Sequence, residues 1–211
     1  MNAADIRKEY KLHTLDENEV EKNAMKQFGK WWDDAIKSDI NEVNAMTLAT
    51  AAPDGKPSAR IVLLKGYDEN GFVFFTNYQS HKGKELAENP QACIVFFWKE
   101  LERQVRVEGE VKKISAVESD AYFNSRPAGS RIGAWASPQS SVIAAREIIE
   151  QEAIKYEQQF ATENIPRPPH WGGYCLQPQL IEFWQGRPSR LHDRIQYTKI
   201  NDSWKIERLA P

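Results

Sequence analysis

The sequence predicts an α+β fold in which a mainly antiparallel sheet forms a barrel with helices packed around it. Strand-like segments gather near both ends of the chain around a helical middle, and they do not alternate with helices as βαβ units do. The chain also has no G-x-G-x-x-G fingerprint and no P-loop, which argues against a Rossmann sheet. Any phosphate group must therefore be held by side chains and scattered backbone amides.

The first predicted element is an amphipathic helix over residues 17–37. Its apolar positions recur near helical spacing, at Val20, Ala24, Phe28, Trp31, Trp32 and Ile36. We interpret the two tryptophans as core residues rather than ligand contacts. The preceding residues 1–16 are polar and aperiodic, so we expect a flexible N-terminal segment ahead of a single domain that spans residues 17–211.

Beyond this helix the hydrophobic period becomes that of a sheet. Short β-like runs bounded by turn residues predict strands at residues 45–51, 58–67, 71–76, 92–98 and 104–114. The first three are expected to be successive antiparallel strands. A short helix over residues 81–88 connects the third strand to the fourth.

A helical middle follows, and the sheet then resumes. A helix over residues 116–125 must end near Arg126, because Pro127 disfavours α conformation in the residue before it. A longer helix is predicted over residues 141–162, ahead of a proline-rich connector. The remaining strands are predicted at residues 173–176, 180–184, 194–199 and 204–209.

The composition limits the classes of function. The net charge is -2 over 211 residues, which gives no support to nucleic-acid binding or membrane-surface binding. No apolar run approaches the ~18 residues of a membrane span, and the start of the chain lacks the apolar core of a signal peptide, so we expect a cytoplasmic protein. Cys93 and Cys175 lack metal-ligand spacing and are expected to be buried, reduced thiols, with no metal site.

The most informative motif is RLHDR at residues 190–194. In an extended strand Arg190, His192 and Arg194 would project from one face, which suits an anionic ligand. A solvated surface strand remains the alternative for such a motif. The preceding Trp184 favours a ligand site, because an aromatic wall beside guanidinium groups suits planar phosphorylated molecules.

Four further segments combine cations with hydrogen-bonding groups. In residues 60–65, the two bases are five positions apart and fall on opposite faces of a regular strand, so they serve different groups or a bulge re-aims one. Residues 75–84 and 101–107 are consistent with an anion site but also with an ordinary helix cap and a solvent-facing hairpin. In residues 122–141, Tyr122 and Arg126 share a helix face with Ser130 beyond the break, which predicts a phosphate pocket.

Together these segments resemble the pyridoxine (pyridoxamine) 5′-phosphate oxidase family. The similarity runs in order through RIVLLK (60–65), LERQV (101–105), SRP (125–127), IGAW (132–135), QSS (139–141), WGG (171–173), IEFWQG (181–186), RLHDR (190–194) and WKIERLAP (204–211). The resemblance spans nearly the whole chain. It implies an FMN-binding split barrel that works as a homodimer, with the flavin at the subunit interface.

The resemblance also assigns residues to the two ligands. It implies that FMN is contacted by Arg60, Ile61, Val62, Leu63, Leu64, Lys65, Phe75, Thr76, His81, Lys82, Gln104, Gln139, Ser140, Trp184 and Arg194. It implies that the phosphorylated substrate is contacted by Arg7, Lys8, Glu9, Tyr10, Lys65, Tyr122, Arg126, Ser130, Arg190, Leu191 and His192. Within the second set, Arg190 and His192 are implied to lie near the reacting carbon, and the N-terminal residues to close over the substrate.

The implied reaction is oxidation of pyridoxine or pyridoxamine 5′-phosphate to pyridoxal 5′-phosphate. A hydride leaves the C4′ carbon for flavin N5, and O2 then reoxidises the flavin to give H2O2. Water releases ammonia when the amine is the substrate. The alternatives are a split-barrel flavin reductase that uses a nicotinamide partner, and a non-catalytic protein that carries flavin or pyridoxal phosphate.

The chain departs from the family pattern at two positions. His81 stands where an arginine is usual on the flavin phosphate, and Phe75 where a tyrosine is common. Neutral imidazole offers one donor and no fixed charge. We therefore expect FMN affinity to increase as His81 becomes protonated, and a His81→Arg variant to lack this dependence between about pH 6 and 8.

Overall fold

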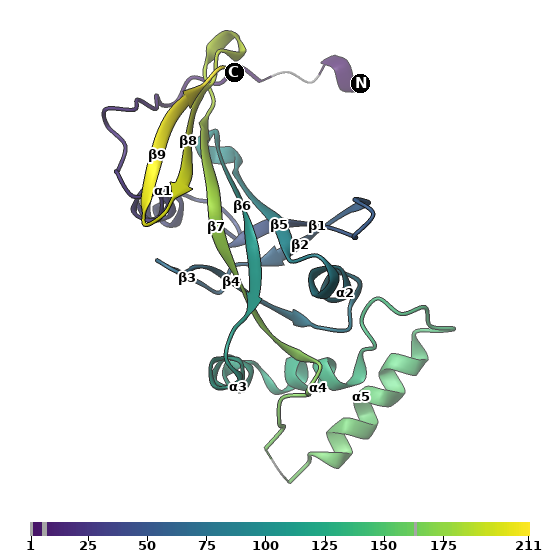
Figure 1. Ribbon diagram of the computed structural model, residues 1–211. Helices are drawn as coiled ribbons and strands as arrows, with labels where there is room; N and C mark the ends of the chain where they lie inside the picture. The colour runs from purple at the N-terminus through teal and green to yellow at the C-terminus, as the bar shows by residue number, and fades with distance from the viewer. Residues whose placement is uncertain (1, 6–7, 163) are drawn as a thin grey trace.

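The computed structural model describes residues 2–5, 8–162 and 164–211. The described residues form one sheet of nine strands, with helices gathered around it (Figure 1). The strands are β1 (Ala45–Ala51), β2 (Pro57–Leu63), β3 (Gly66–Asp68), β4 (Gly71–Asn77), β5 (Gln91–Trp98), β6 (Arg103–Lys113), β7 (Trp171–Gln185), β8 (Asp193–Ile200) and β9 (Ser203–Leu209). Every pairing is antiparallel, which confirms the predicted split barrel with surrounding helices.

The barrel closes at Leu64 and Lys65. The main strand order is β2-β1-β5-β6-β7-β4-β3, so the chain passes from one end of the sheet to the other between β2 and β3. The Leu64 amide donates to the Asn44 carbonyl at 2.8 Å, and the Lys65 amide donates to the Val73 carbonyl at 2.8 Å. The prediction of one strand over residues 58–67 is therefore wrong, because the chain must leave one neighbour before it joins the other.

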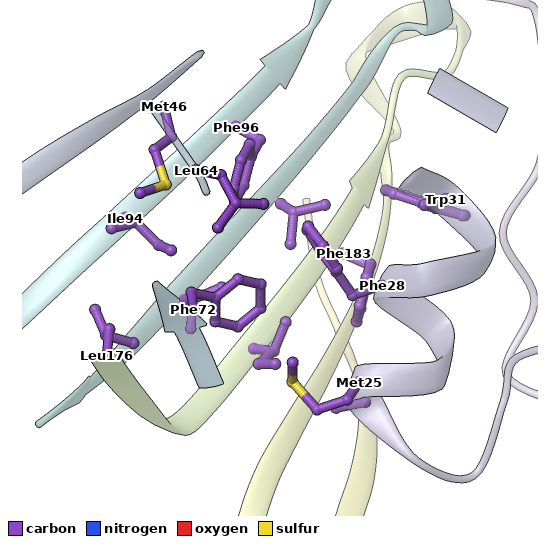
Figure 2. Close-up of a cluster of buried hydrophobic side chains, with 14 of the residues drawn as sticks. Met25, Phe28, Trp31, Met46, Leu64, Phe72, Ile94, Phe96, Leu176 and Phe183 are labelled. Atoms are coloured by element: carbon purple, nitrogen blue, oxygen red, sulfur yellow. The ribbon is translucent and has the colours of Figure 1, made fainter. Parts of the chain in front are cut away.

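Helix α1 (Ala24–Lys37) packs side chains such as Phe28 and Trp31 against those of the sheet (Figure 2). Phe28 is fully buried, and its ring centroid lies 4.8 Å from that of Phe72 and 5.4 Å from that of Phe96. Trp31 is also buried, and Trp32 is partly buried against the same cluster, which confirms that this pair belongs to the core.

Helix α1 begins seven residues later than predicted. The Asn23 side chain accepts hydrogen bonds from the Met25 and Lys26 amides at 2.7 and 3.1 Å, and so caps the helix. Residues before this cap form turns rather than a helix. Val20 fitted the predicted apolar pattern because it packs against the core, but it lies before the cap and so outside the helix.

The helical middle contains α3 (Ala116–Ser125), α4 (Ala128–Ala136) and α5 (Glu147–Gln159), and the earlier connection is α2 (His81–Glu88). The bounds predicted for α2 and α3 are confirmed. Helix α4 was not predicted, although it buries Ile132 and Ala136. Helix α5 begins six residues later than predicted. Short 3-10 turns occur at η1 (Ala3–Asp5), η2 (Lys99–Leu101) and η3 (Pro188–Arg190).

Strand β7 combines two predicted strands into one. Pro178, between the two predicted strands, lies opposite Gly109, where the register between β6 and β7 shifts at a bulge. In Figure 1, α3, α4 and α5 lie near one end of β7, and the turn that leads to β8 lies at the other end.

Cys93 and Cys175 are free thiols, half-buried rather than buried as predicted. No helix among the described residues is long and apolar enough to cross a bilayer.

The aromatic core predicts a large cost for truncating Phe28. Phe28→Ala is expected to lower the free energy of unfolding by about 3–5 kcal/mol, because it removes a fully buried ring and leaves a cavity. Ile36→Ala in the same helix is the control, since Ile36 is 58% exposed. Urea denaturation of both variants measures the difference. A similar loss in both would contradict this account of the core.

Candidate active site

One cavity brings together many of the predicted ligand contacts. It has a volume of 320 Å³, opens between β2, β4 and α3, and is here called the phosphate cavity. Its lining residues are Ile61, Val62, Leu63, Lys65, Phe75, Thr76, Asn77, Lys82, Tyr122, Arg126, Gln139 and Trp171. Asn77 and Trp171 were not predicted as site residues. The WGG motif at residues 171–173 could have indicated Trp171, but Asn77 carries no comparable signal.

Lys82 is a buried cation in the phosphate cavity. Its Nζ donates to the Thr76 hydroxyl at 3.1 Å, and no ion pair joins it to a carboxylate among the described residues. Burial and then the charge of Arg60 lower the pKa of Lys82 below its usual value. A buried ammonium group without a counter-ion is costly, so this site suits an anionic group such as a phosphate.

Arg126 is a second cation of this kind. Its Nη1 atom is buried and has no hydrogen-bond partner in the part of the chain that the structure describes, and its guanidinium lies 4.7 Å from the Trp171 ring centroid. Burial lowers the pKa of Arg126. The Tyr122 ring stacks on Phe75 with centroids 3.9 Å apart. The cavity therefore offers a guanidinium with an unused donor beside a wall of stacked rings.

Ser130 lies in an adjoining cavity of 300 Å³ that shares Arg126 and Gln139 with the phosphate cavity. Tyr122 and Arg126 thus line one cavity and Ser130 lines the next, while their binding of a phosphate stays a prediction. The break at Pro127 turns the chain between the two helices, so that α3 and α4 each contribute to this region.

Arg60 and His81 lie around Glu85 instead of lining the phosphate cavity. Glu85 is buried, and its carboxylate lies 3.3 Å from the Arg60 guanidinium and 3.1 Å from His81 Nε2. Burial alone would raise the pKa of Glu85, but hydrogen bonds from Ser58 and Thr50 and the nearby cations hold it below its usual value. The expected effect of His81 on FMN affinity stays a prediction.

A second cavity, of 470 Å³, lies beyond the far end of β7 and is here called the loop cavity. It is lined by Lys8, Glu9, Tyr10, Arg187, Ser189, Arg190 and His192. The prediction that Arg190, His192 and Arg194 alternate along one strand is wrong. Ser189 and Arg190 have φ of 55° and 62°, and strand β8 begins only at Asp193. This left-handed turn places Arg190 and His192 on a loop, and Arg194 alone in the strand.

His192 is held in a defined orientation. The Arg187 amide donates to His192 Nδ1 at 3.1 Å, and the imidazole lies 4.6 Å from the Trp184 ring. Burial and then the charge of Arg190 lower the pKa of His192, while Asp193 opposes them. Because Nδ1 accepts a hydrogen bond, the neutral ring carries its proton on Nε2, which is left as a donor.

Three predicted flavin contacts form a row across the sheet beside the loop cavity. Gln104 of β6 lies opposite Trp184 of β7, which lies opposite Arg194 of β8. The Arg194 guanidinium binds the buried Glu182 carboxylate at 2.8 Å and the Ala210 carbonyl at 2.9 Å. These contacts fix the side chain, and the hydrogen bonds that Arg194 donates to Glu182 raise the pKa of Arg194.

The remaining predicted residues lie outside both cavities. The Leu64 side chain is buried in the core, so that residue offers a ligand only its backbone. Leu191 is 69% exposed, and Ser140 is exposed with a φ of 71°. Arg7 lies outside the described residues. Residues 8–15, here called the N-terminal strap, run beside the loop cavity, and their closure over a substrate stays a prediction.

The two cavities are far apart within one protomer. Trp171 at the first residue of β7 lines the phosphate cavity, while the loop cavity follows Gln185 at its last residue. Fourteen rises of about 3.3 Å separate these ends by up to about 45 Å. Strand β7 runs extended between these ends (Figure 1), so no single small ligand can reach both cavities.

Comparison with known proteins identifies related chains. Residues 32–160 match the family model described as pyridoxamine 5′-phosphate oxidase, and residues 171–211 match the pyridoxine 5′-phosphate oxidase C-terminal dimerisation region. A relative from Trichormus variabilis, named pyridoxine/pyridoxamine 5′-phosphate oxidase, is 59% identical over 99% of this chain and 98% of its own length. One of the same name from Paraburkholderia phymatum is 60% identical with the same coverage.

Solved structures show the same fold. PhzG from Burkholderia lata, in complex with tetrahydrophenazine-1-carboxylic acid, superposes with a TM-score of 0.90 at 28% identity, covering 97% of this chain and 100% of that one. A pyridoxamine 5′-phosphate oxidase-related, FMN-binding protein from Nostoc punctiforme has a TM-score of 0.71 at 19% identity, covering 91% of this chain and 100% of that one.

The buried charge of Lys82 predicts a gain in stability when it is removed. Lys82→Met is expected to stabilise ligand-free protein by about 1 kcal/mol, because an uncompensated buried cation disappears. Added inorganic phosphate should then stabilise the variant less than the wild type. Thermal unfolding in phosphate-free and phosphate buffers measures both effects. Lys84→Met is the control, since Lys84 is exposed on the same helix; a lower Tm for Lys82→Met would contradict the prediction.

The environment of His192 predicts its titration. Its pKa should lie below the ordinary value of 6.5, and NMR titration of the imidazole protons measures it. Arg190→Gln should raise this pKa by removing a positive charge, whereas Arg190→Lys should not. Since the unfolded chain takes up the proton first, the contribution of His192 to stability falls as the pH drops below 6.5 and levels off below the folded pKa. A pKa above 6.5 in the wild type would refute this.

Proposed function

This chain belongs to the pyridoxamine 5′-phosphate oxidase family, and from that premise we propose that it oxidises pyridoxine or pyridoxamine 5′-phosphate to pyridoxal 5′-phosphate. FMN would be its cofactor and O2 its electron acceptor, giving H2O2, with NH3 released from the amine. Bound FMN would supply the hydride-accepting chemistry. The protein would supply the binding, orientation and charge.

The observation that carries this proposal is a pair of cations in one cavity, the buried Lys82 and the half-buried Arg126, whose Nη1 atom is itself buried. Among the described residues, Lys82 has only a hydroxyl partner, and Arg126 has a buried Nη1 without any partner. Two uncompensated cations suit two phosphate groups, one on the cofactor and one on the substrate. An unphosphorylated molecule would leave both cations without a counter-ion.

The residues around these cations divide into two groups. We assign Lys82, Thr76 and Gln139 to FMN, in line with the family pattern. We assign Arg126, Tyr122 and Lys65 to the substrate phosphate, with Ser130 at the edge. Lys65 fits this role because it lines the same cavity and its Nζ lies 5.9 Å from the Tyr122 ring centroid. Phosphate binding then positions the reacting carbon.

Arg190 and His192 would act on the substrate ring. Because His192 Nδ1 already accepts the Arg187 amide, only Nε2 faces a ligand, and in the neutral ring Nε2 is a donor. We therefore assign His192 the role of donating a hydrogen bond to the substrate, and not of removing a proton. Arg190 would cover the ring with its guanidinium plane.

The distance between the two cavities supports a shared site in a homodimer. In a two-fold symmetric pair, the phosphate cavity of one protomer can meet the loop cavity of its partner, and the reverse contact follows by symmetry. The match of residues 171–211 to a dimerisation region agrees with this arrangement, because those residues include β7 and the loop. Each dimer would then carry two composite sites.

The direct test of the function is a spectroscopic assay. Purified protein, supplied with FMN if needed, is expected to show flavin absorbance and to convert both B6 phosphate esters in air to pyridoxal 5′-phosphate with H2O2. Bleaching of the flavin by NADH but not by either ester would favour a flavin reductase. Flavin binding without turnover of either ester would favour a carrier.

Mixing two inactive variants tests the composite site. Arg126→Gln and Arg190→Leu are each expected to lower kcat/KM on the order of 10²-fold, because both misplace the substrate. In a random mixture about half of the dimers are mixed, and each of these has one intact site, so about a quarter of wild-type activity should return. Activity that stays at the level of the single variants would place both residues in one protomer's site.

A further inference from the structure

We propose that Glu102 is a positioning residue, which holds the N-terminal strap against the loop cavity before any substrate arrives. The proposal rests on the function proposed above, since the loop cavity is there assigned to the substrate ring. Glu102 itself does not line the loop cavity. It acts on that cavity through the strap and through the end of β7.

The Glu102 carboxylate binds the strap through three donors. Its Oε2 accepts hydrogen bonds from the Lys11 and Leu12 amides at 2.8 and 3.1 Å, and its Oε1 lies 3.2 Å from Lys8 Nζ. The residue is only 2% exposed. Burial would raise the pKa of Glu102, but these donors lower it, so the carboxylate is charged at neutral pH.

The Glu102 backbone binds the end of β7, which lies on the other side of Tyr10 from the strap backbone. Its carbonyl accepts a hydrogen bond from the Gly186 amide at 2.7 Å and from Gln185 Nε2 at 3.1 Å. Tyr10 packs so closely on Gly186 that a Cβ added there would lie 2.7 Å from the Tyr10 Cβ. Glu102 therefore binds both segments that hold Tyr10: the strap through its carboxylate, and the end of β7 through its carbonyl.

Tyr10 transmits this position to the site. Its ring lies 5.7 Å from that of Trp184 in an edge-to-face contact, and 6.0 Å from the His192 ring. Lys8, Glu9 and Tyr10 all line the loop cavity. Holding them in place beforehand reduces the ordering cost of binding, so the expected benefit is a lower KM and not a faster chemical step.

The backbone at Glu102 argues that the carboxylate is kept for these contacts. Its φ of 54° and ψ of 38° lie in the left-handed region, where Gly or Asn is favoured over Glu. The turn alone would be better served by glycine. Glu102→Gly should therefore fold well, because it relieves this conformation while it removes the carboxylate.

Hydrogen exchange without substrate tests the anchor. In Glu102→Gly, the Lys11 and Leu12 amides should exchange on the order of tenfold faster or more, because their acceptor is gone. The Leu15 amide is an internal reference, since it donates to Asp193 at 3.1 Å and should stay protected. Glu100→Gly adds the same flexibility in the same turn, and it should leave all three amides unchanged because Glu100 is exposed.

Steady-state kinetics tests the positioning role. Glu102→Gly should raise KM for pyridoxine 5′-phosphate on the order of tenfold with kcat within about twofold, and Glu100→Gly should match the wild type. Unchanged exchange at Lys11 and Leu12, or faster exchange with an unchanged KM, would overturn the proposal. If the wild type oxidises neither ester, the proposed function fails, while the exchange data still decide whether Glu102 anchors the strap.

Discussion

The length of β7 is the constraint on which the rest of the structure depends. This strand pairs with β4, β6 and β8, and so joins the curled barrel to the C-terminal hairpin. It begins at one candidate half-site and ends at the other, up to about 45 Å away. A protomer thus carries both halves without uniting them. Symmetric pairing is the simplest way to unite them, because one interface then completes two sites.

The cations of the candidate site fall into two electrostatic classes. Arg60 and Arg194 are neutralised by the buried carboxylates Glu85 and Glu182, which hold their guanidinium groups in place. Lys82 is buried and Arg126 is half-buried with a buried Nη1 atom, and neither has such a partner among the described residues. A neutralised cation costs little free energy in the ligand-free protein, whereas an unpaired cation is compensated only when an anion binds. This contrast separates residues that organise the site from those that await a ligand.

Local signals explain which elements could be predicted. Helices α2 and α3 were predicted at their observed bounds, and their N-caps Ser80 and Ser115 and the Pro127 that follows α3 all lie within a few residues of those ends. The predictions that were wrong depend on distant partners. The strand over residues 58–67 breaks because the barrel closes there, and residues 190–192 form a loop because consecutive left-handed residues precede β8. No pattern of neighbouring residues indicates either the barrel closure or the loop.

The sequence by itself determined the fold class, the core tryptophans and the family, because periodicity, caps and motifs are carried by neighbouring residues. It also indicated most residues that line the two cavities. Only the tertiary structure decided which cations are neutralised, that the cavities lie at opposite ends of β7, and that Glu102 binds amides 90 and 91 positions away. The reason is physical. A charge is compensated, and a segment is held in place, by the groups that pack against it. These groups are distant in the sequence, and only folding brings them together.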